Sequence, residues 1–546
     1  MSWKENKPFS IPQIKDFIPE RLKPWVVILF MFIFQCTGGV YMAAVSEIVG
    51  STQLLQEDVM MAGFSSLVGM SLYFVLMFRL KSAVRPKSTL STCLLVLIVA
   101  NIICIHTSNV MVLIGVCTIT GFFRLWAIFE CNSTIQLWLS PKRDMSVFFT
   151  YIFLTVNAAM QITGIGISIF SWWASWEYMN WFVIGLLISM WIIVLIIYKG
   201  IAIMPRIPLL GVDWLGMLMW GATCLSLLFV CIYGEHYDWW QSEHIRFATL
   251  FGISMLAMTL LRASFIRHPY IMIKTMRMPI VPLSILGVLL ANILLAPSHI
   301  CEHLLMENIL GYDHLHATSL NWVSLVGIVM GALFTWQSFA VRKWTYQRML
   351  VIGFSLLGIY LGYFYFVIDY SLPKEALYFP IFTRSVAQII ISTTLLTSIT
   401  RLPFPFHFTQ GVTLHNMFSS VLAANIGTAL VGRLFKVSMT RNTMWLSEGM
   451  DHVNQDIRNL SIGNLYGMIQ VQALVESMKE VYGWLLFVAI LCLIGLMMRY
   501  SSIRPRRVIE PTYRAIYKFI RTDVRSHMRF RQRNSHALHS HSSNVR

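Results

Sequence analysis

Residues 178–198 read YMNWFVIGLLISMWIIVLIIY, a run of 21 residues without a charged side chain. At a rise of about 1.5 Å per residue, an α-helix of this length spans roughly 30 Å, the thickness of the hydrocarbon core of a bilayer. Apolar runs of similar length recur along the chain and are separated by short polar turns. In lipid every backbone N–H and C=O must be satisfied within the protein, and these runs are too long for barrel strands. They therefore predict membrane-spanning helices.

The composition supports this prediction. Hydrophobic residues make up 56% of the chain and charged residues only 12%, whereas a soluble globular protein carries about 25% charged residues. We expect about fourteen spans, and therefore an all-α polytopic membrane protein. The expected spans are approximately 25–47, 59–79, 89–107, 110–132, 146–171, 178–198, 212–233, 245–265, 279–300, 318–340, 347–369, 377–400, 408–431 and 481–499.

The charged loops predict the orientation of the chain in the membrane. Lys and Arg gather in alternate loops, for example at Arg79–Arg85 and Arg342–Arg348, and the loops between them are acidic or neutral. Under the positive-inside rule both termini are cytoplasmic, which an even number of spans also requires. Much of the net charge of +17 lies after Arg499, where basic residues directly follow the last span. Such residues meet anionic lipid at the membrane surface, so nucleic acid is not an expected partner.

Helix breakers and basic residues at 199–212 and 267–279 divide the chain. The predicted division is a cytoplasmic N-terminal segment (1–24), a six-helix bundle (25–198), an accessory helix pair (199–268), a second six-helix bundle (269–499) and a basic cytoplasmic tail (500–546). Within the second bundle, residues 433–481 form a long outer loop. The apolar positions from Ile462 to Met478 suit an amphipathic helix that rests at the outer surface.

Several short motifs occur in one order along the chain. They are Ser175-Trp176-Glu177 before the sixth span, Val212-Asp213-Trp214-Leu215-Gly216 at the seventh, Glu307-Asn308-Ile309-Leu310-Gly311-Tyr312 with His316-Ala317-Thr318 after the ninth, and Gly411, Asn416 and Asn425-Ile426-Gly427-Thr428-Ala429-Leu430 in the thirteenth. In these motifs the sequence resembles the fourteen-span drug:proton antiporters of the major facilitator superfamily, the EmrB/QacA type. The resemblance implies two six-helix bundles plus two accessory helices, which export amphipathic small molecules in exchange for protons.

The resemblance also implies a location and partners. It places the protein in a bacterial inner membrane. Relatives in Gram-negative bacteria work with a periplasmic adaptor, a membrane fusion protein, and an outer-membrane channel. The outer loop at 433–481 is where we expect adaptor contact.

The N-terminal hallmarks of that family are degraded here. The loop after the second span reads Arg79-Leu80-Lys81-Ser82-Ala83-Val84-Arg85, which keeps the positive charges of the family's Gly–Asp–Arg–Gly pattern and lacks its aspartate. The first-span aspartate of such exporters falls near Gly38 or Gly39. The fifth-span antiporter motif reads Thr163-Gly164-Ile165-Gly166 and has no proline. These losses affect the coupling chemistry that the resemblance implies, and they leave the expected fold intact.

Two charged residues lie inside the fourth span. A charge near the bilayer centre costs roughly 2.5–3.5 kcal/mol on insertion scales, so such residues are functional candidates. Arg124 and Glu130 lie about 120° and about 9 Å apart on a helix, and we expect no ion pair between them. Arg124 either takes the place of the family's fourth-span arginine, which aligns near Cys117, in a proton relay, or forms a structural salt bridge to another helix.

Six further polar residues are candidates for the substrate or proton pathway. They are Arg384 and Gln388 in the twelfth span, Asn157 and Gln161 in the fifth, and His415 and Asn416 in the thirteenth. The first two pairs have i, i+4 spacing, so each pair shares a helix face. Arg384 either faces a cavity, where it favours anionic or amphipathic substrates, or snorkels outward. The amides either bind substrate or join helices, and His415 either carries a proton or packs as a neutral side chain.

The sequence offers little for other chemistries. It has no GxxxxGK[ST] motif, so we do not expect direct drive by ATP. The nine cysteines include no CxxC pair, and the histidines and acidic residues of 299–316 follow no metal-ligand spacing. We therefore expect no metal, no cofactor and no enzyme. Two alternatives stay open: a degenerate facilitator that acts as a sensor or scaffold, and a membrane transferase whose one candidate acid–base pair is His452 and Asp456.

Overall fold

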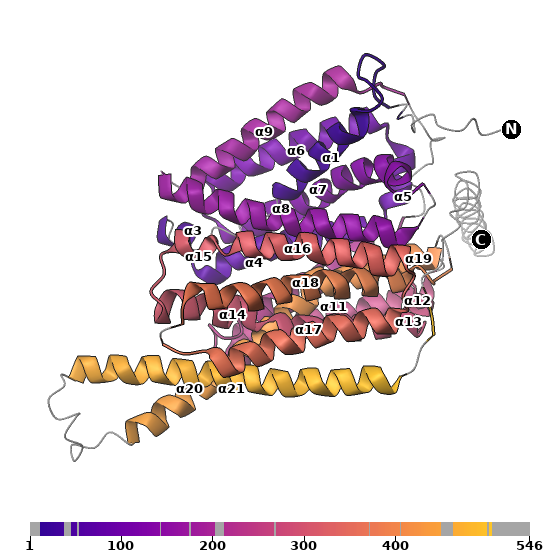
Figure 1. Ribbon diagram of the computed structural model, residues 1–546. Coiled ribbons are helices and arrows are strands. Elements are labelled where there is room, and N and C mark those ends of the chain that lie inside the picture. Colours follow the sequence, from indigo (N-terminus) through magenta and orange to yellow (C-terminus); the bar gives the residue numbers. More distant parts are fainter. Residues whose placement is uncertain are drawn as a thin grey trace, which may run out of the picture.

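The computed structural model describes residues 11, 13–37, 45–51, 54–141, 144–173, 176–201, 212–266, 269–370, 372–403, 406–448, 462–499 and 502–504. Over these residues the chain is a stack of helices that run roughly side by side, with α1 to α9 on one side and α13 to α21 on the other (Figure 1). The N-terminal end of α1 and the C-terminal end of α21 lie at the same end of the stack (Figure 1). The all-helical prediction is confirmed for the described residues.

The first set of helices comprises α1 (Lys23–Cys36), α3 (Val45–Ser51), α4 (Gln56–Tyr73), α5 (Met77–Ala83), α6 (Pro86–His106), α7 (Val110–Leu139), α8 (Met145–Trp173) and α9 (Trp176–Ile197). Helix α4 bends by 72° into α5. The expected second span, 59–79, is therefore broken after Tyr73, and α5 carries Lys81 back toward α7.

The accessory pair consists of α10 (Trp214–Tyr233), the single turn η1 (Trp239–Gln241) and α11 (Glu243–Phe265). Asp213 caps α10, because its carboxylate accepts a 3.0 Å hydrogen bond from the Gly216 amide. The same carboxylate pairs with Arg262 of α11 at 2.8 Å. Helix α10 packs against α4 of the first set and against α20 of the second, so the pair lies along the boundary between the two sets.

The second set contains the remaining helices and three π-helical turns. They are α12 (Ile273–Met276), α13 (Ile280–Leu295), α14 (Pro297–Leu304), η2 (Leu305–Ile309), α15 (His314–Thr318), α16 (Asn321–Thr335), η3 (Trp336–Val341), α17 (Tyr346–Val367), α18 (Lys374–Ile399), α19 (Phe406–Asn416), η4 (Met417–Ala423), α20 (Ala424–Glu448) and α21 (Ile462–Met498).

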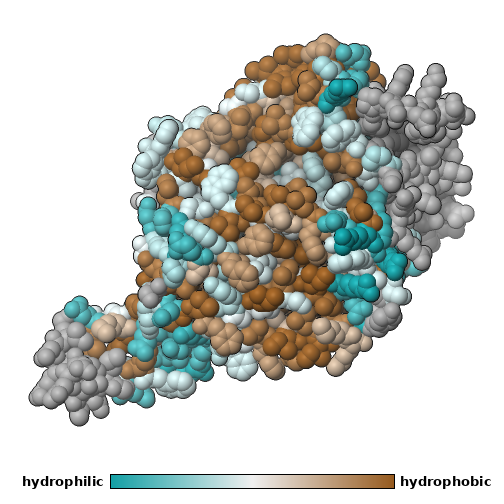
Figure 2. Space-filling model, in the orientation of Figure 1, coloured by the Kyte–Doolittle hydropathy of each residue, from teal (hydrophilic) through white to brown (hydrophobic). Residues whose placement is uncertain are grey.

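The described helices account for most of the expected spans. Twelve of them are long and apolar enough to cross a membrane, and thirteen if the bent pair α4 and α5 counts as one span. The fourteen-residue α1 is shorter, and residues 38–44 after it lie outside the described residues. The count of about fourteen therefore stays a prediction. Figure 2 shows the apolar side chains in a broad band between two more hydrophilic ends, as a bilayer requires.

The expected outer loop at 433–481 is instead largely helical. Helix α20 continues to Glu448 and α21 begins at Ile462, and the two pack as an antiparallel hairpin that projects beyond the other helices (Figure 1). The 37 residues of α21 span about 55 Å, well beyond the roughly 30 Å of a hydrocarbon core. The segment 462–478, expected as a separate surface helix, is thus continuous with the last span in one helix.

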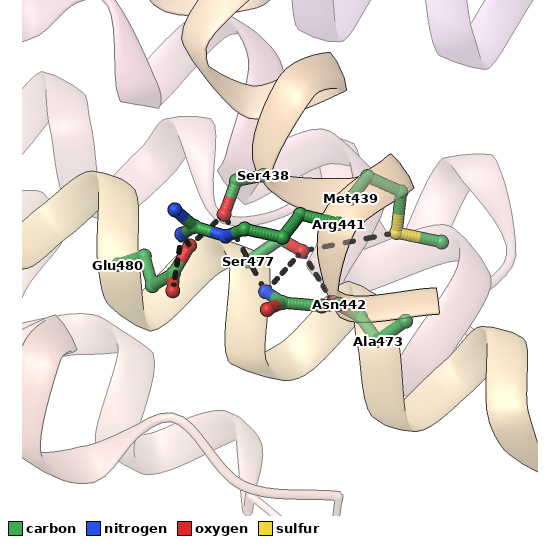
Figure 3. Close-up of polar contacts among 7 residues, drawn as sticks. All are labelled: Ser438, Met439, Arg441, Asn442, Ala473, Ser477 and Glu480. Carbon is green, nitrogen blue, oxygen red and sulfur yellow. Dashed lines mark hydrogen bonds and ion pairs between the residues drawn. The ribbon is translucent and has the colours of Figure 1, made fainter. Parts of the chain in front are cut away.

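Polar contacts join the two helices of this hairpin (Figure 3). Arg441 of α20 donates two hydrogen bonds, of 2.6 and 2.7 Å, to the Glu480 carboxylate of α21. Ser438 also contacts Glu480, and the Asn442 amide donates a 3.0 Å hydrogen bond to the Ser477 hydroxyl. These contacts add to the apolar packing of Val475, Met478 and Val481, which are buried in the hydrophobic core.

Candidate translocation site

Two of the predicted residues meet between the two halves of the molecule. The Gln388 amide of α18 donates a 3.4 Å hydrogen bond to the Asn157 side-chain oxygen of α8, and the Asn157 amide donates a 2.8 Å bond to the Phe153 carbonyl. Both residues lie near the middle of long helices. The contact is therefore at mid-membrane level. Gln161, one turn beyond Asn157, is partly buried.

Helix α8 also contacts the second half near both of its ends. At one end the Ser168 hydroxyl lies 2.9 Å from the Thr318 hydroxyl of α15. At the other end Asp144, just before α8, forms an ion pair with Lys343, just after η3. Ser140 orders the turn before α8, because the Asp144 backbone amide donates a 2.7 Å hydrogen bond to the Ser140 hydroxyl. The two halves are thus joined along α8 at three levels.

Arg384 has a partner that the sequence did not indicate. Its guanidinium lies 2.9 Å from the Glu302 carboxylate of α14, and the Tyr360 hydroxyl of α17 donates a 2.7 Å hydrogen bond to the other carboxylate oxygen. The exposed fraction of the Glu302 side chain is 6% and that of Arg384 is 17%. Arg384 therefore forms a largely buried ion pair between helices.

Glu130 and Arg124 do not pair with each other, as expected. Glu130 lies 4.0 Å from Lys81, whose ammonium also contacts Ser133 and lies 5.7 Å from the centre of the Phe129 ring. The retained lysine of the degraded loop motif thus finds a carboxylate on α7. Arg124 is buried, its guanidinium 2.6 Å from the Met70 sulfur of α4, and it forms no ion pair with any residue whose side chain the structure describes.

The thirteenth-span candidates differ in burial. His415 is fully buried, with its Nδ1 2.9 Å from the Ser284 hydroxyl of α13. Asn416 is the last residue of α19, before the π-helical turn η4.

Of the residues considered for metal binding, Glu302 is engaged by Arg384 and His303 lies 3.1 Å from Glu307. His452 and Asp456 lie outside the described residues.

Comparison with known proteins places the fold. No protein-family model and no curated protein sequence gives a significant match. Solved structures do match. Nucleoside transporter NupG aligns with a TM-score of 0.53 and 11% identity over 88% of this chain and 100% of its own. Tetrameric PepTSo2 aligns with a TM-score of 0.56 and 10% identity over 88% and 97%. A structure of proton-dependent oligopeptide transporters aligns with a TM-score of 0.54 and 11% identity over 87% and 97%.

At such low identity the likeness shows the fold alone. The protein is an all-helical membrane protein with the major facilitator fold. The structures it resembles are those of membrane transporters, and they align over nearly their whole length.

Proposed function

We propose that this protein is a secondary active transporter that exports amphipathic small molecules in exchange for protons, of the fourteen-span EmrB/QacA type. The observation that carries the proposal is the Asn157–Gln388 contact. It joins the two halves of a major facilitator fold at mid-membrane level, where transporters built from two repeats bind their substrates.

The contacts along α8 support an alternating mechanism. In a rocking motion the two bundles separate first at one membrane face and then at the other. The Asp144–Lys343 ion pair and the Ser168–Thr318 hydrogen bond lie at opposite ends of α8. Each is a polar contact that forms and breaks without disturbing an apolar core. We infer that the ion pair closes the cytoplasmic face and the hydroxyl pair the outer face.

Proton coupling requires a group that can change its protonation state within the membrane, such as a carboxylate or a histidine. Glu302 is the best candidate among the described residues, because it lies between Arg384 and Tyr360 on three different helices. Glu130, near Lys81, is the corresponding carboxylate of the first half. Neither occupies the first-span position of the family's aspartate, so coupling here uses a different residue.

The α20–α21 hairpin supports a partner outside the membrane. It extends beyond the bundle and is held together by the contacts of Glu480 with Arg441 and Ser438. Near its far end Trp445 and Tyr466 are exposed, at 62% and 57%. We propose that this hairpin contacts a periplasmic adaptor in a bacterial inner-membrane complex that continues to an outer-membrane channel.

Photocrosslinkers at Trp445 and Tyr466 should capture the adaptor, and one at Phe265, exposed on α11, should not.

Accumulation of fluorescent amphipathic compounds tests the transport proposal. Cells that express the protein should accumulate less compound than cells without the gene, and a protonophore should abolish the difference. A difference that survives the protonophore would refute proton coupling. No difference for any compound, with the protein present in the membrane, would favour the sensor or scaffold alternative.

A further inference from the structure

Arg124 lies near the middle of α7, and its residue surface is only 4% exposed. One guanidinium nitrogen, Nη2, is 2.6 Å from the Met70 sulfur, and Nε has no hydrogen-bond partner. A thioether is a weak acceptor that carries no negative charge. The charge of this buried guanidinium is therefore not compensated by any side chain that the structure describes.

Other buried cations of the protein differ from Arg124 in this respect. Arg384 pairs with Glu302 at 2.9 Å, Lys23 pairs with Glu20 at 2.6 Å, and Lys81 lies 4.0 Å from Glu130. A buried ion without a counter-charge carries a desolvation penalty of several kcal/mol. Such a residue persists when something else, such as a bound anion, offsets the penalty in a working state.

Two further polar groups of α4 and α7 are buried without a hydrogen-bond partner. The Trp126 indole N–H, two residues along α7, is buried without a partner, and so is the Tyr73 hydroxyl, one turn beyond Met70 on α4. The Tyr73 and Trp126 rings stack with their centroids 6.4 Å apart, and the Phe123 ring is 5.8 Å from Trp126. At about 100° per residue Trp126 lies on the other side of α7 from Arg124, so these groups are not part of its site. The guanidinium of Arg124 only donates hydrogen bonds and lies within an apolar helix, which favours an anionic acceptor attached to an apolar body.

Helices α4 and α7, which carry Met70 and Arg124, pack closely against each other. A Cβ atom at Gly69, next to Met70, would lie 1.8 Å from the Thr118 carbonyl oxygen of α7, so the backbones of α4 and α7 are in direct contact. Met70 is the adaptable part, because its unbranched side chain has three rotatable bonds. Its sulfur occupies the position beside Arg124 that an incoming oxygen would take.

We propose that Arg124 binds the anionic group (carboxylate, sulfonate or phosphate) of an amphipathic organic anion, which displaces the Met70 sulfur. This inference names a substrate class and rests on the proposed transport function. The site lies in the first half of the molecule and is separate from the Glu302–Arg384 ion pair.

Thermal unfolding of the purified full-length protein in a neutral detergent tests this proposal without knowledge of the natural substrate. Arg124→Met removes the uncompensated charge and retains an unbranched apolar side chain, so it should raise Tm in the absence of anions. Arg384→Met is the matched control. It leaves Glu302 buried and unpaired, so it should lower Tm. A lower Tm for Arg124→Met would overturn the proposal, because Arg124 would then be a structural residue.

Probes with one alkyl chain and different head groups test the ligand class. Octanoate, octanesulfonate or octyl phosphate should raise the Tm of the wild type and of Arg124→Lys, and should not raise that of Arg124→Met. Octylammonium should have no Arg124-dependent effect. Equal responses of wild type and Arg124→Met, or no response to any of the three anions, would overturn the proposal. The same follows if phosphatidylglycerol alone produces an Arg124-dependent rise, because the ligand is then a membrane lipid. An absence of transport would refute the proposed function and leave these Tm differences in place.

Discussion

At the scale of single residues, the sequence identifies the intramembrane polar groups but not their partners. Arg124, Asn157, Arg384 and Gln388 are visible because polar residues are costly and rare within apolar runs. The partner of Arg384 is Glu302, 82 positions earlier in the chain. Only tertiary packing brings them together, and no local periodicity encodes it. Glu302 stands at the end of a predicted span beside two histidines, where it resembles an ordinary loop carboxylate.

The buried ion pair gives a prediction about stability. Glu302→Gln leaves the Arg384 guanidinium buried without a counter-charge, and Arg384→Met leaves the Glu302 carboxylate so. Each variant should lower the free energy of unfolding by about 3–5 kcal/mol. The double variant should recover much of that loss, because it buries no unpaired charge. Denaturant unfolding in detergent measures all three. Equal and additive losses would contradict the pairing.

The central amide contact gives a prediction about transport. Asn157→Leu or Gln388→Leu should reduce the transport rate by roughly 3-fold to 30-fold, since interhelical hydrogen bonds in membranes contribute about 0.6–2 kcal/mol. Asn292→Leu is a suitable control, because the Asn292 amide bonds to Val288 within its own helix. Initial rates in proteoliposomes provide the measurement. A control variant that loses as much activity would remove the special role of the contact.

At the scale of secondary-structure elements, hydrophobic runs predict where helices lie better than where they end. The run at 178–198 corresponds to α9 within a few residues. The segment 433–481 does not, because residues such as Arg441, Asn442 and Glu480 look like loop residues in sequence and instead join two helices. The break after Tyr73 was equally hidden, since the apolar run continues through it.

The hairpin contacts predict a local effect on stability. Glu480→Ala removes the hydrogen bonds from Arg441 and should speed amide hydrogen exchange in residues 438–448 and 466–480 by about fivefold, which corresponds to about 1 kcal/mol for a partly exposed pair. Lys479→Ala changes the charge at the neighbouring position and serves as the control. Unchanged exchange in Glu480→Ala would show that apolar contacts alone hold the hairpin.

Glu235, in the loop between α10 and α11, predicts a dependence of stability on pH. Burial raises the pKa of Glu235, but hydrogen bonds from Lys436, at 2.6 Å, and Trp239, at 2.8 Å, outweigh it and lower the pKa below its ordinary value. Because the pKa is lower in the folded state, the contact stabilises the protein above the ordinary Glu pKa and is lost as pH falls through the lowered value. When the pH is lowered from 7 to 3, the Tm of the wild type should fall further than the Tm of Glu235→Gln. Parallel losses would contradict this.

At the scale of the whole molecule, the fold was predictable and the working state was not. Span number, apolar length and the order of weak motifs indicated a major facilitator fold, which the structural likeness confirms. Which faces of the two halves touch was not predictable, because the Asp144–Lys343 and Ser168–Thr318 contacts involve loop and helix-end residues with no distinctive spacing.

Controlled closure of one end of the α8 boundary tests the alternating mechanism most directly. Asp144→Cys and Lys343→Cys are combined in a background without the nine native cysteines and joined by a short bis-methanethiosulfonate reagent. If the two halves must separate there in each cycle, cross-linking abolishes transport in proteoliposomes, reductant restores it, and neither single-cysteine variant responds. Full transport by completely cross-linked protein would contradict the mechanism.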